Sequence, residues 1–257
     1  KPMVVICVPT QWKMILACPE IDRFDTSSVL VAMTGAGVNP ASTKKEILKR
    51  FHHSLVVDIF GQTEMTPDTT IRIDAAQDGI KNKSVGKPLA GIEMRIADEN
   101  GQDVSQGETG EILYRSPTIM KEYYGEKEKT AQVIRDGWFY SGDLGYIDKD
   151  GELIVVDRKG ECISTGGEKV FPHEVEEIIS GNEKVDSVCV IGIPDEIWGH
   201  SVRAVVVIKD GHKATQEEII AWCAGKMTGF KRPKSALFAD SLPLSPVGKV
   251  LRSQVKA

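Results

Sequence analysis

The sequence predicts a mixed fold, α/β at its start and α+β at its end, in three consecutive parts. Short apolar strands alternate with helices over residues 1–83, which indicates a parallel α/β layer. Closely spaced hairpins over residues 84–157 indicate a small antiparallel β-barrel. Residues 158–257 have the pattern of a separate α+β domain, which we expect to be a mobile lid.

The first part opens with two short apolar segments, residues 4–8 and 29–33, each followed by a helical pattern. The second helix, residues 41–53, is predicted to begin after Asn39-Pro40, a good cap followed by a proline at the first turn. A third strand, residues 55–60, runs directly into Gly61-Gln62-Thr63-Glu64. This alternation predicts a parallel sheet.

The second part contains strand patterns with turn signals between them. Strands are expected at Glu93–Ala97, Gly110–Arg115 and residues 153–156, with a short amphipathic helix at residues 126–134. Asn100-Gly101 and Asp150-Gly151 are typical hairpin turns.

The third part is predicted to alternate helices and strands, and residues 157–160, at the boundary with the second part, form a candidate hinge. The expected elements are a helix at Pro172–Ser180, strands at residues 185–193 and 202–208, a helix at residues 216–227, and a short strand near Ala236.

Composition is that of an ordinary folded protein, with 257 residues, 41% of them hydrophobic and 27% charged. No apolar run approaches the roughly 18 residues of a transmembrane segment. The chain does not begin with an initiator methionine and its first residues do not form a secretory signal, so we expect a truncated sequence from a cytoplasmic protein. The five cysteines have no CxxC spacing, which favours free thiols over zinc or disulfides.

Charge is distributed unevenly along the chain. The net charge is −5, yet residues 226–257 carry seven basic residues and one acidic residue, Asp240. A basic tail on an acidic protein suits a small polyanionic ligand, and a solvated basic face is the alternative. Few aromatic residues interleave with the basic ones, so nucleic acid is not an expected partner.

The first polar cluster, Phe60-Gly61-Gln62-Thr63-Glu64, follows a predicted strand directly. Ligands bind at strand ends in open α/β sheets. The Thr63 hydroxyl could donate to a phosphate oxygen, and the Glu64 carboxylate could hold Mg²⁺. The alternative is a simple helix cap.

A second cluster is the expected exposed turn Ser141-Gly142-Asp143. The two oxygens of Asp143 could accept hydrogen bonds from both hydroxyls of a ribose, although an Asx turn would use the same residues. Arg158 could add a ribose or phosphate contact. Asp157-Arg158 could equally form a surface ion pair, worth under about 1 kcal/mol.

Two later loops complete the set of polar clusters. Gly166-Gly167, near Lys169, has no Gly-Lys-Ser/Thr sequence and so does not match a nucleoside-triphosphatase loop. These glycines suit either the close approach of a thin ligand or a tight turn. Lys249 lies in a loop, residues 243–252, that is expected to enter a terminal helix.

In this order and at these separations, the clusters resemble the adenylate-forming superfamily of acyl-CoA synthetases, adenylation domains and firefly-type luciferases. The resemblance covers almost the whole chain and rests on five segments. They are Gly35-Ala36-Gly37, residues 60–64, Ser141-Gly142-Asp143, residues 157–176 and residues 243–252.

The resemblance implies that residues 1–83 are the C-terminal part of a large α/β subdomain, and it implies a role for each of these segments. Gly35, Ala36, Gly37 and residues 60–64 would contact the nucleotide, with Glu64 on Mg²⁺ and Asp143 and Arg158 on the ribose. Lys249 would be the catalytic lysine of adenylation, with Thr63 and Glu64 beside the phosphates. Gly160 occupies the hinge position, and Gly166, Gly167 and Glu168 would line the pantetheine path.

The implied reaction joins a carboxylic acid to ATP as acyl-AMP and then transfers the acyl group to coenzyme A. The run from Cys162 to Pro172 is more similar to ligases of fatty or bulky hydrophobic acids than to peptide-synthetase domains. The family's phosphate loop is expected upstream of Lys1, so this segment alone is expected to have little activity. A fatty-acyl-AMP ligase that loads a carrier protein, and a non-catalytic nucleotide-binding fragment, stay as alternatives, and a homodimer is left open.

Overall fold

The computed structural model describes residues 1–37, 39–81, 84–246 and 248–255. The chain divides into two compact units, Lys1–Val155 and Val156–Ala257. Apart from residues 156 and 157, the first two predicted parts therefore lie in one unit. The division of that unit at residue 83 stays a prediction. No described helix has both the length and the apolar character needed to cross a membrane.

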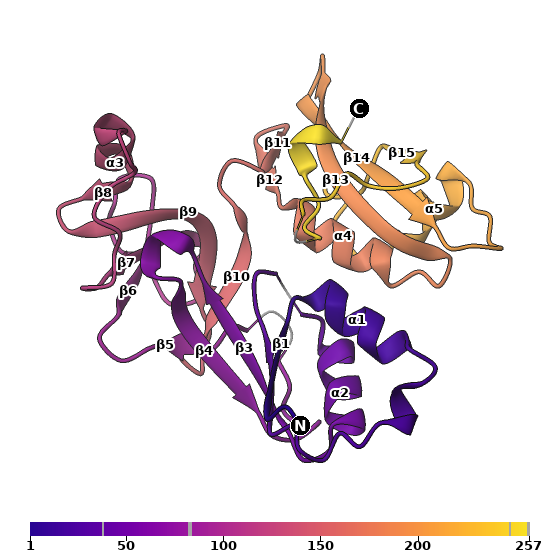
Figure 1. The fold of residues 1–257 in the computed structure, drawn as a ribbon. Coiled ribbons are helices and arrows are strands. Elements are labelled where there is room, and N and C mark those ends of the chain that lie inside the picture. Colours follow the sequence, from indigo (N-terminus) through magenta and orange to yellow (C-terminus); the bar gives the residue numbers. More distant parts are fainter. Residues whose placement is uncertain (38, 82–83, 247, 256–257) are drawn as a thin grey trace. The chain divides into compact units, whose positions relative to one another are not determined.

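The first unit contains a five-stranded sheet in which the strands follow one another in sequence order (Figure 1). Its strands are β1 (Val4–Cys7), β2 (Val31–Thr34), β3 (Leu55–Gly61), β4 (Asp68–Asp74) and β5 (Lys87–Pro88). The first three strands pair in parallel, as the strand and helix alternation predicts, while β4 and β5 are antiparallel additions. The carboxyl ends of β2 and β3 therefore meet at one edge of the sheet.

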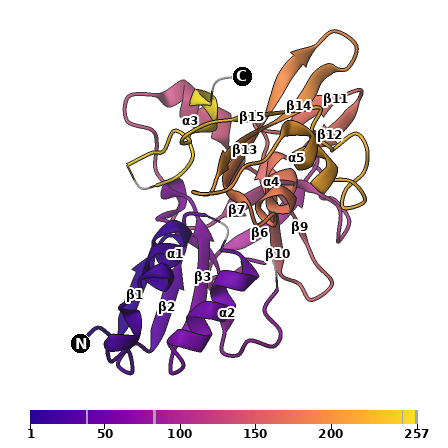
Figure 2. The same cartoon turned by 90° about the vertical axis from the view of Figure 1, so that its right-hand side faces the viewer.

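Helices α1 (Pro9–Ala17) and α2 (Ala41–Arg50) lie on the same face of the parallel strands (Figures 1 and 2). Trp12 of α1 and Ile47 of α2 are fully buried, and both belong to the apolar core that contains Ala32 and Val56. Ala32 and Val56 are paired across β2 and β3, so they share a face. This face is the inner surface of the α/β layer. A short 3₁₀ turn, Ile21–Arg23, follows α1.

The predicted cap of α2 is wrong in detail. Pro40 occupies the position before the helix, and its side chain cannot accept a hydrogen bond from the first turn. The Asn39 side chain is buried one residue earlier, and neither of its polar atoms has a partner among the described residues. The helix also ends at Arg50, three residues before the expected end at His53.

The second sheet of this unit is a curled antiparallel half-barrel with the strand order β10-β9-β7-β6. Its strands are β6 (Glu93–Ala97), β7 (Gly110–Arg115), β9 (Trp138–Ile147) and β10 (Leu153–Arg158). The short strand β8 (Ile134–Arg135), which follows α3 (Lys127–Val133), pairs with β9. Buried residues from the sheet and Met65, within the 3₁₀ turn Thr63–Met65, form one core, so the half-barrel packs beside the end of β3.

The second unit is built on a three-stranded sheet of β13 (Val185–Asp195), β14 (Gly199–Ile208) and β15 (Ser235–Phe238). Alternate residues of β13 face opposite sides, with Val190 in the core that contains residues of α4 (Pro172–Ser180) and α5 (Gln216–Trp222). Cys189 and Ile191 belong to a second core together with Leu242. The C-terminal segment therefore covers the face of the sheet opposite the helices.

Two helices of this unit are shorter than predicted. Helix α5 begins at a capping box, in which the Thr215 side chain accepts a hydrogen bond from the backbone of Glu218, but it ends at Trp222 rather than at residue 227. The expected terminal helix is a single 3₁₀ turn, Arg252–Gln254. A hairpin of β11 (Ile163–Thr165) and β12 (Glu168–Val170) precedes α4.

Candidate functional site

The first candidate segment, Gly35-Ala36-Gly37, directly follows β2. A side chain at Gly35 would place its Cβ 2.8 Å from Cγ1 of Ile59 on the neighbouring strand, so only glycine fits this approach. Ala36 adopts a left-handed conformation with φ of 62°. The tight turn therefore presents backbone at the edge of the sheet beside the end of β3.

The second segment turns sharply at the end of β3. A side chain at Gly61 would place its Cβ 2.0 Å from the carbonyl oxygen of Pro67, which explains the glycine. After it, Gln62 is half-buried and Thr63 is exposed. Glu64 is half-buried, and its Oε1 accepts a hydrogen bond of 2.8 Å from the Tyr123 hydroxyl.

The expected exposed turn at residues 141–143 is wrong, because these residues lie inside β9. Glu111 pairs with Leu144 and Leu113 pairs with Tyr140, so three residues of β9 lie opposite the single residue Ile112. This bulge is made possible by Gly142, whose φ of 72° is left-handed. Ser141 and Asp143 are consequently buried, with 8% and 5% of their surface exposed.

The bulge directs Asp143 toward Gln62 at the end of β3. Gln62 Nε2 donates to Asp143 Oδ2 and, at 3.0 Å, to the carbonyl oxygen of Ser141. Ser141 Oγ donates to the carbonyl of Ile112 at 2.6 Å and accepts from the backbone N–H of Asp143 at 3.0 Å. These bonds fix the Asp143 carboxylate beside the end of β3.

Two residues around this carboxylate were missed by the sequence analysis. Burial raises the pKa of the Tyr114 hydroxyl, and the negative charge of Asp143 raises it further. Glu111 Oε1 accepts a hydrogen bond of 3.1 Å from the backbone N–H of Gly142, which supports the bulge. Both residues lie on β7, and no local pattern could have linked them to Asp143.

The donor set around Glu64 fits Mg²⁺. No group of three His, Cys, Asp or Glu side chains in the described part of the chain could hold a metal ion alone. Mg²⁺ commonly binds through one or two carboxylates together with the phosphates of its substrate. Tyr123 orients the Glu64 carboxylate without cancelling its charge, so one protein carboxylate is available for an ion shared with a nucleotide.

In the second unit, Asp157 is buried, whereas Arg158 is exposed. Asp157 Oδ2 accepts a hydrogen bond of 3.0 Å from the backbone N–H of His173 in the first turn of α4, and Oδ1 accepts one of 2.8 Å from that of Arg158. Burial raises the pKa of Asp157, and these hydrogen bonds oppose the rise. Asp157 therefore anchors the start of α4 and leaves Arg158 at the surface.

The predicted glycine bend is the two-residue loop between β11 and β12. Gly166 and Gly167 both have left-handed φ values, 58° and 85°, and Thr165 pairs with Glu168 across the loop. A Cβ at Gly166 would lie 2.6 Å from Cε3 of Trp198. The loop thus packs its backbone against an indole ring. At Gly167, by contrast, a Cβ would have no described atom within 4 Å.

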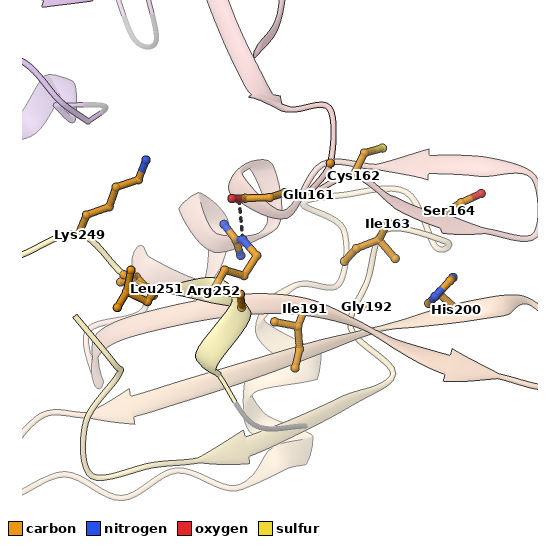
Figure 3. A pocket seen from close by; sticks show the side chains of 13 residues that line it. Glu161, Cys162, Ile163, Ser164, Ile191, Gly192, His200, Lys249, Leu251 and Arg252 are labelled. Atoms are coloured by element: carbon orange, nitrogen blue, oxygen red, sulfur yellow. Dashed lines mark hydrogen bonds and ion pairs between the residues drawn. The ribbon is translucent and has the colours of Figure 1, made fainter. Parts of the chain in front are cut away.

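Lys249 lines a pocket of about 590 Å³ within the second unit (Figure 3). The same pocket is lined by Gly160 of the candidate hinge, by Glu161, which follows it, and by Ser164 of β11. Lys249 is exposed, and in Figure 3 it lies apart from Glu161 and Arg252, which point toward one another. The lysine loop and the candidate hinge therefore lie on one pocket of this unit.

The sequence-predicted residues thus form two groups. The first unit brings together the strand-end segments and Asp143, while the second unit brings together Gly160 and Lys249. Because Asp143 and Arg158 belong to different units, their joint action on one ribose stays a prediction.

Comparisons with known proteins match both units. The family model of the AMP-binding enzyme matches residues 1–124, and that of the AMP-binding enzyme C-terminal domain matches residues 174–249. One family model thus matches within each of the two units. The chain belongs to the AMP-binding enzyme family, with acyl-CoA ligases among its relatives.

Individual relatives cover almost all of the chain. A feruloyl-CoA synthase from an Amycolatopsis species is 39% identical over 98% of this chain and 51% of its own length. A long-chain-fatty-acid–CoA ligase from Bacillus subtilis is 34% identical over 99% of this chain and 45% of its own. A fatty acid–[acyl-carrier-protein] ligase from Streptomyces coeruleorubidus is 31% identical over 97% of this chain and 48% of its own.

The fold of the chain is also similar to that of a solved structure. The crystal structure of ATP-bound MatB from Rhodopseudomonas palustris has a TM-score of 0.90 and 31% identity over 98% of this chain and 50% of its own. The chain spans about half the length of the relatives that it matches.

Proposed function

We propose that the protein is an ATP-dependent acyl-CoA ligase, which activates a carboxylic acid as acyl-AMP and then transfers the acyl group to coenzyme A. The observation that carries the proposal is the bulge at Gly142, which directs the buried Asp143 carboxylate to Gln62 at the end of β3. Strand ends are where open α/β sheets bind nucleotides. The family model of the AMP-binding enzyme matches residues 1–124, which include Gln62 and the end of β3.

In this proposal the first unit holds the nucleotide. Gly35, Ala36 and Gly37 contact the adenine with their backbone, and Asp143 accepts hydrogen bonds from the ribose hydroxyls, while Phe60, Gly61 and Gln62 shape the wall beside it. Thr63 donates to a phosphate oxygen. Glu64 holds Mg²⁺, which would neutralise phosphate charge when bound.

The second unit supplies the groups that act during the two half-reactions. Lys249 bridges the acid and the α-phosphate, because an ammonium group can hold both anionic partners while charge develops. Arg158 adds a ribose contact, and Gly160 is the pivot of the unit. Gly166, Gly167 and Glu168 line the path of the thiol, where backbone without side chains permits close approach.

The acid is proposed to be fatty or bulky and hydrophobic, and the acceptor to be coenzyme A. The names of the ligases from Amycolatopsis and Bacillus subtilis support both proposals. The relative from Streptomyces coeruleorubidus acts, by its name, on a carrier protein, so this acceptor is the competing possibility.

The test measures the two half-reactions separately in the complete enzyme. Acyl-AMP formation is followed by ATP–pyrophosphate exchange with a panel of aromatic and aliphatic acids, and the acceptor is either coenzyme A or a phosphopantetheinylated carrier protein. Lys249→Ala is expected to slow acyl-AMP formation by about 10²–10³-fold, the cost of one preorganised charge. Exchange at the wild-type rate in Lys249→Ala would refute the role of the lysine. Acyl transfer to the carrier protein alone would refute coenzyme A as the acceptor.

A further inference from the structure

Arg252 lies three residues after Lys249 but has the opposite environment. The side chain of Lys249 is exposed, whereas only 20% of the Arg252 side chain is exposed. A half-buried arginine beside a proposed catalytic lysine needs a reason, because removing a charge from water is costly unless it is paired.

Three groups from separate segments hold the Arg252 guanidinium. Nε donates to Glu161 Oε2 at 2.7 Å, Nη2 donates to Glu176 Oε2 at 3.4 Å, and Nη1 donates to the carbonyl oxygen of Val190. Burial alone would lower the pKa of Arg252, but its hydrogen bonds to the two glutamates raise it instead. The guanidinium is therefore a fixed positive charge between two carboxylates.

The acceptors are themselves fixed. Glu176 lies on α4, and its Oε1 accepts a hydrogen bond of 2.7 Å from the backbone N–H of Val190 on β13. Its Oε2 lies 3.8 Å from Nδ1 of His173. Glu176 therefore joins the helix and the sheet, and Arg252 binds to this rigid point.

The segment before Arg252 forms a small hairpin that presents Lys249. The backbone N–H of Ser245 donates to the carbonyl oxygen of Lys249 at 2.7 Å, and its Oγ accepts from the backbone N–H of Lys249 at 3.1 Å. The N–H of Leu251 donates to the carbonyl of Pro243 at 2.8 Å. Leu242, which is 8% exposed, fixes the first arm in the core, so Arg252 is the polar anchor of the second arm.

The ion pair with Glu161 links Arg252 to the candidate hinge. Glu161 directly follows Gly160, and both residues line the pocket that Lys249 lines (Figure 3). We propose that Arg252, through its ion pairs with Glu161 and Glu176, is a positioning residue that fixes the Lys249 hairpin relative to the pivot at Gly160. The inference rests on the proposed function, because it assigns Arg252 to the adenylation half-reaction in which Lys249 acts.

This role differs from simple stabilisation of the fold. The apolar residues Leu242, Val250 and Val255 already pack the same segment onto the sheet. A pair anchored next to the pivot would instead determine where the ammonium group lies, and small errors in the position of a reacting group are expensive in rate. Loss of Arg252 should therefore slow acyl-AMP formation only when Lys249 is present.

The test uses the complete enzyme with Arg252→Gln, Glu161→Gln, Lys249→Ala, and the double variant Lys249→Ala with Arg252→Gln. Glu161→Gln removes one arm of the anchor at a partly exposed site, so it stays informative if Arg252→Gln does not fold. The matched control is Arg203→Gln, because Arg203 is a half-buried arginine of the same unit that bonds the neutral Ser235 Oγ at 2.9 Å. Each variant is assayed for acyl-AMP formation and for thiol transfer from supplied acyl-AMP.

Arg252→Gln is expected to slow acyl-AMP formation by about 10–10²-fold, with a smaller loss in Glu161→Gln. In the Lys249→Ala background, Arg252→Gln should add no more than about twofold, and thiol transfer should change by no more than about twofold in either single variant. Arg203→Gln should leave both half-reactions near wild type.

Equal loss of both half-reactions in Arg252→Gln and Glu161→Gln, or multiplicative losses in the double variant, would overturn the positioning role. These outcomes are distinct from failure of the proposed function. If Lys249→Ala itself forms acyl-AMP at the wild-type rate, the proposed role of the lysine is wrong. If acyl-AMP formation is slow in Lys249→Ala but normal in Arg252→Gln, only the positioning role of Arg252 is wrong.

Discussion

Replacing Asp143 by asparagine tests the proposed nucleotide site with little change in shape. Asp143 is 5% exposed, and one of its oxygens accepts a hydrogen bond from Gln62, which the asparagine oxygen can retain. The substitution removes the charge and turns one acceptor into a donor. A hydrogen bond to a charged group contributes about 1.5–3 kcal/mol, against about 1 kcal/mol for a neutral one. Loss of two charged ribose contacts should therefore weaken binding by about 2–3 kcal/mol, or about 30- to 150-fold.

Calorimetric titration of the complete enzyme with AMP measures this loss directly. The matched control is Asp103→Asn, because Asp103 lies in the same unit with its side chain 68% exposed and pairs with Arg95 at 2.8 Å. The control should bind AMP as the wild type does. Wild-type affinity in a folded Asp143→Asn variant would refute the assignment of Asp143 to the ribose.

Three further predictions concern stability and transfer. Gly166→Val places a branched side chain at a left-handed residue against Trp198, so it should destabilise the protein by about 1–3 kcal/mol in thermal unfolding and slow thiol transfer, and an unchanged melting temperature would contradict the packing. Lys44→Met leaves the buried Asp58 carboxylate without its cation and should cost about 3–5 kcal/mol in denaturant unfolding, whereas a neutral effect would show that the pair is dispensable. Burial raises the pKa of Glu176, but hydrogen bonds to its carboxylate outweigh this effect, so the pKa is lower in the folded protein than in the unfolded chain. The contribution of Glu176 to folding stability is therefore full above the unfolded pKa of about 4.3 and is lost as pH falls below it. Acid unfolding should therefore be less steep in Glu176→Gln, and an identical pH profile would contradict this sign.

Much of the fold was predictable because its signals are local. Residues of β13 alternate between two cores, Val190 toward the helices and Cys189 toward the C-terminal segment. The continuous apolar run Val188-Cys189-Val190-Ile191 is typical of a strand that is buried on both faces. The parallel strands were predictable for the same reason, since each short apolar run is followed by a helix. Helix ends were less predictable, because the α2 helix starts after Pro40 rather than at a side-chain cap from Asn39.

The sequence proposes candidate site residues, but it does not predict their geometry. The bulge at residues 141–143 depends on pairing with Ile112, so the sequence alone suggested an exposed turn where the structure has a buried strand. The bond from Tyr123 to Glu64 spans 59 positions. Such contacts follow from tertiary packing, and no turn or capping pattern in the sequence predicts them.

The same limit applies to the anchor of the lysine hairpin. Arg252 binds Glu161 and Glu176, which precede it by 91 and 76 positions. The sequence placed Lys249 in a loop before a terminal helix, and the structure instead has a hairpin held by an ion cluster and followed by one 3₁₀ turn.

The most direct measurement is chemical labelling of the complete enzyme with an adenosine analogue that carries a sulfonyl fluoride in place of the phosphates. Peptide mass spectrometry should find the label on Lys249, with protection by excess ATP and reduced labelling in Asp143→Asn. An unlabelled Lys249 in enzyme that binds the analogue normally would contradict the claim that this lysine reaches the nucleotide held by Asp143.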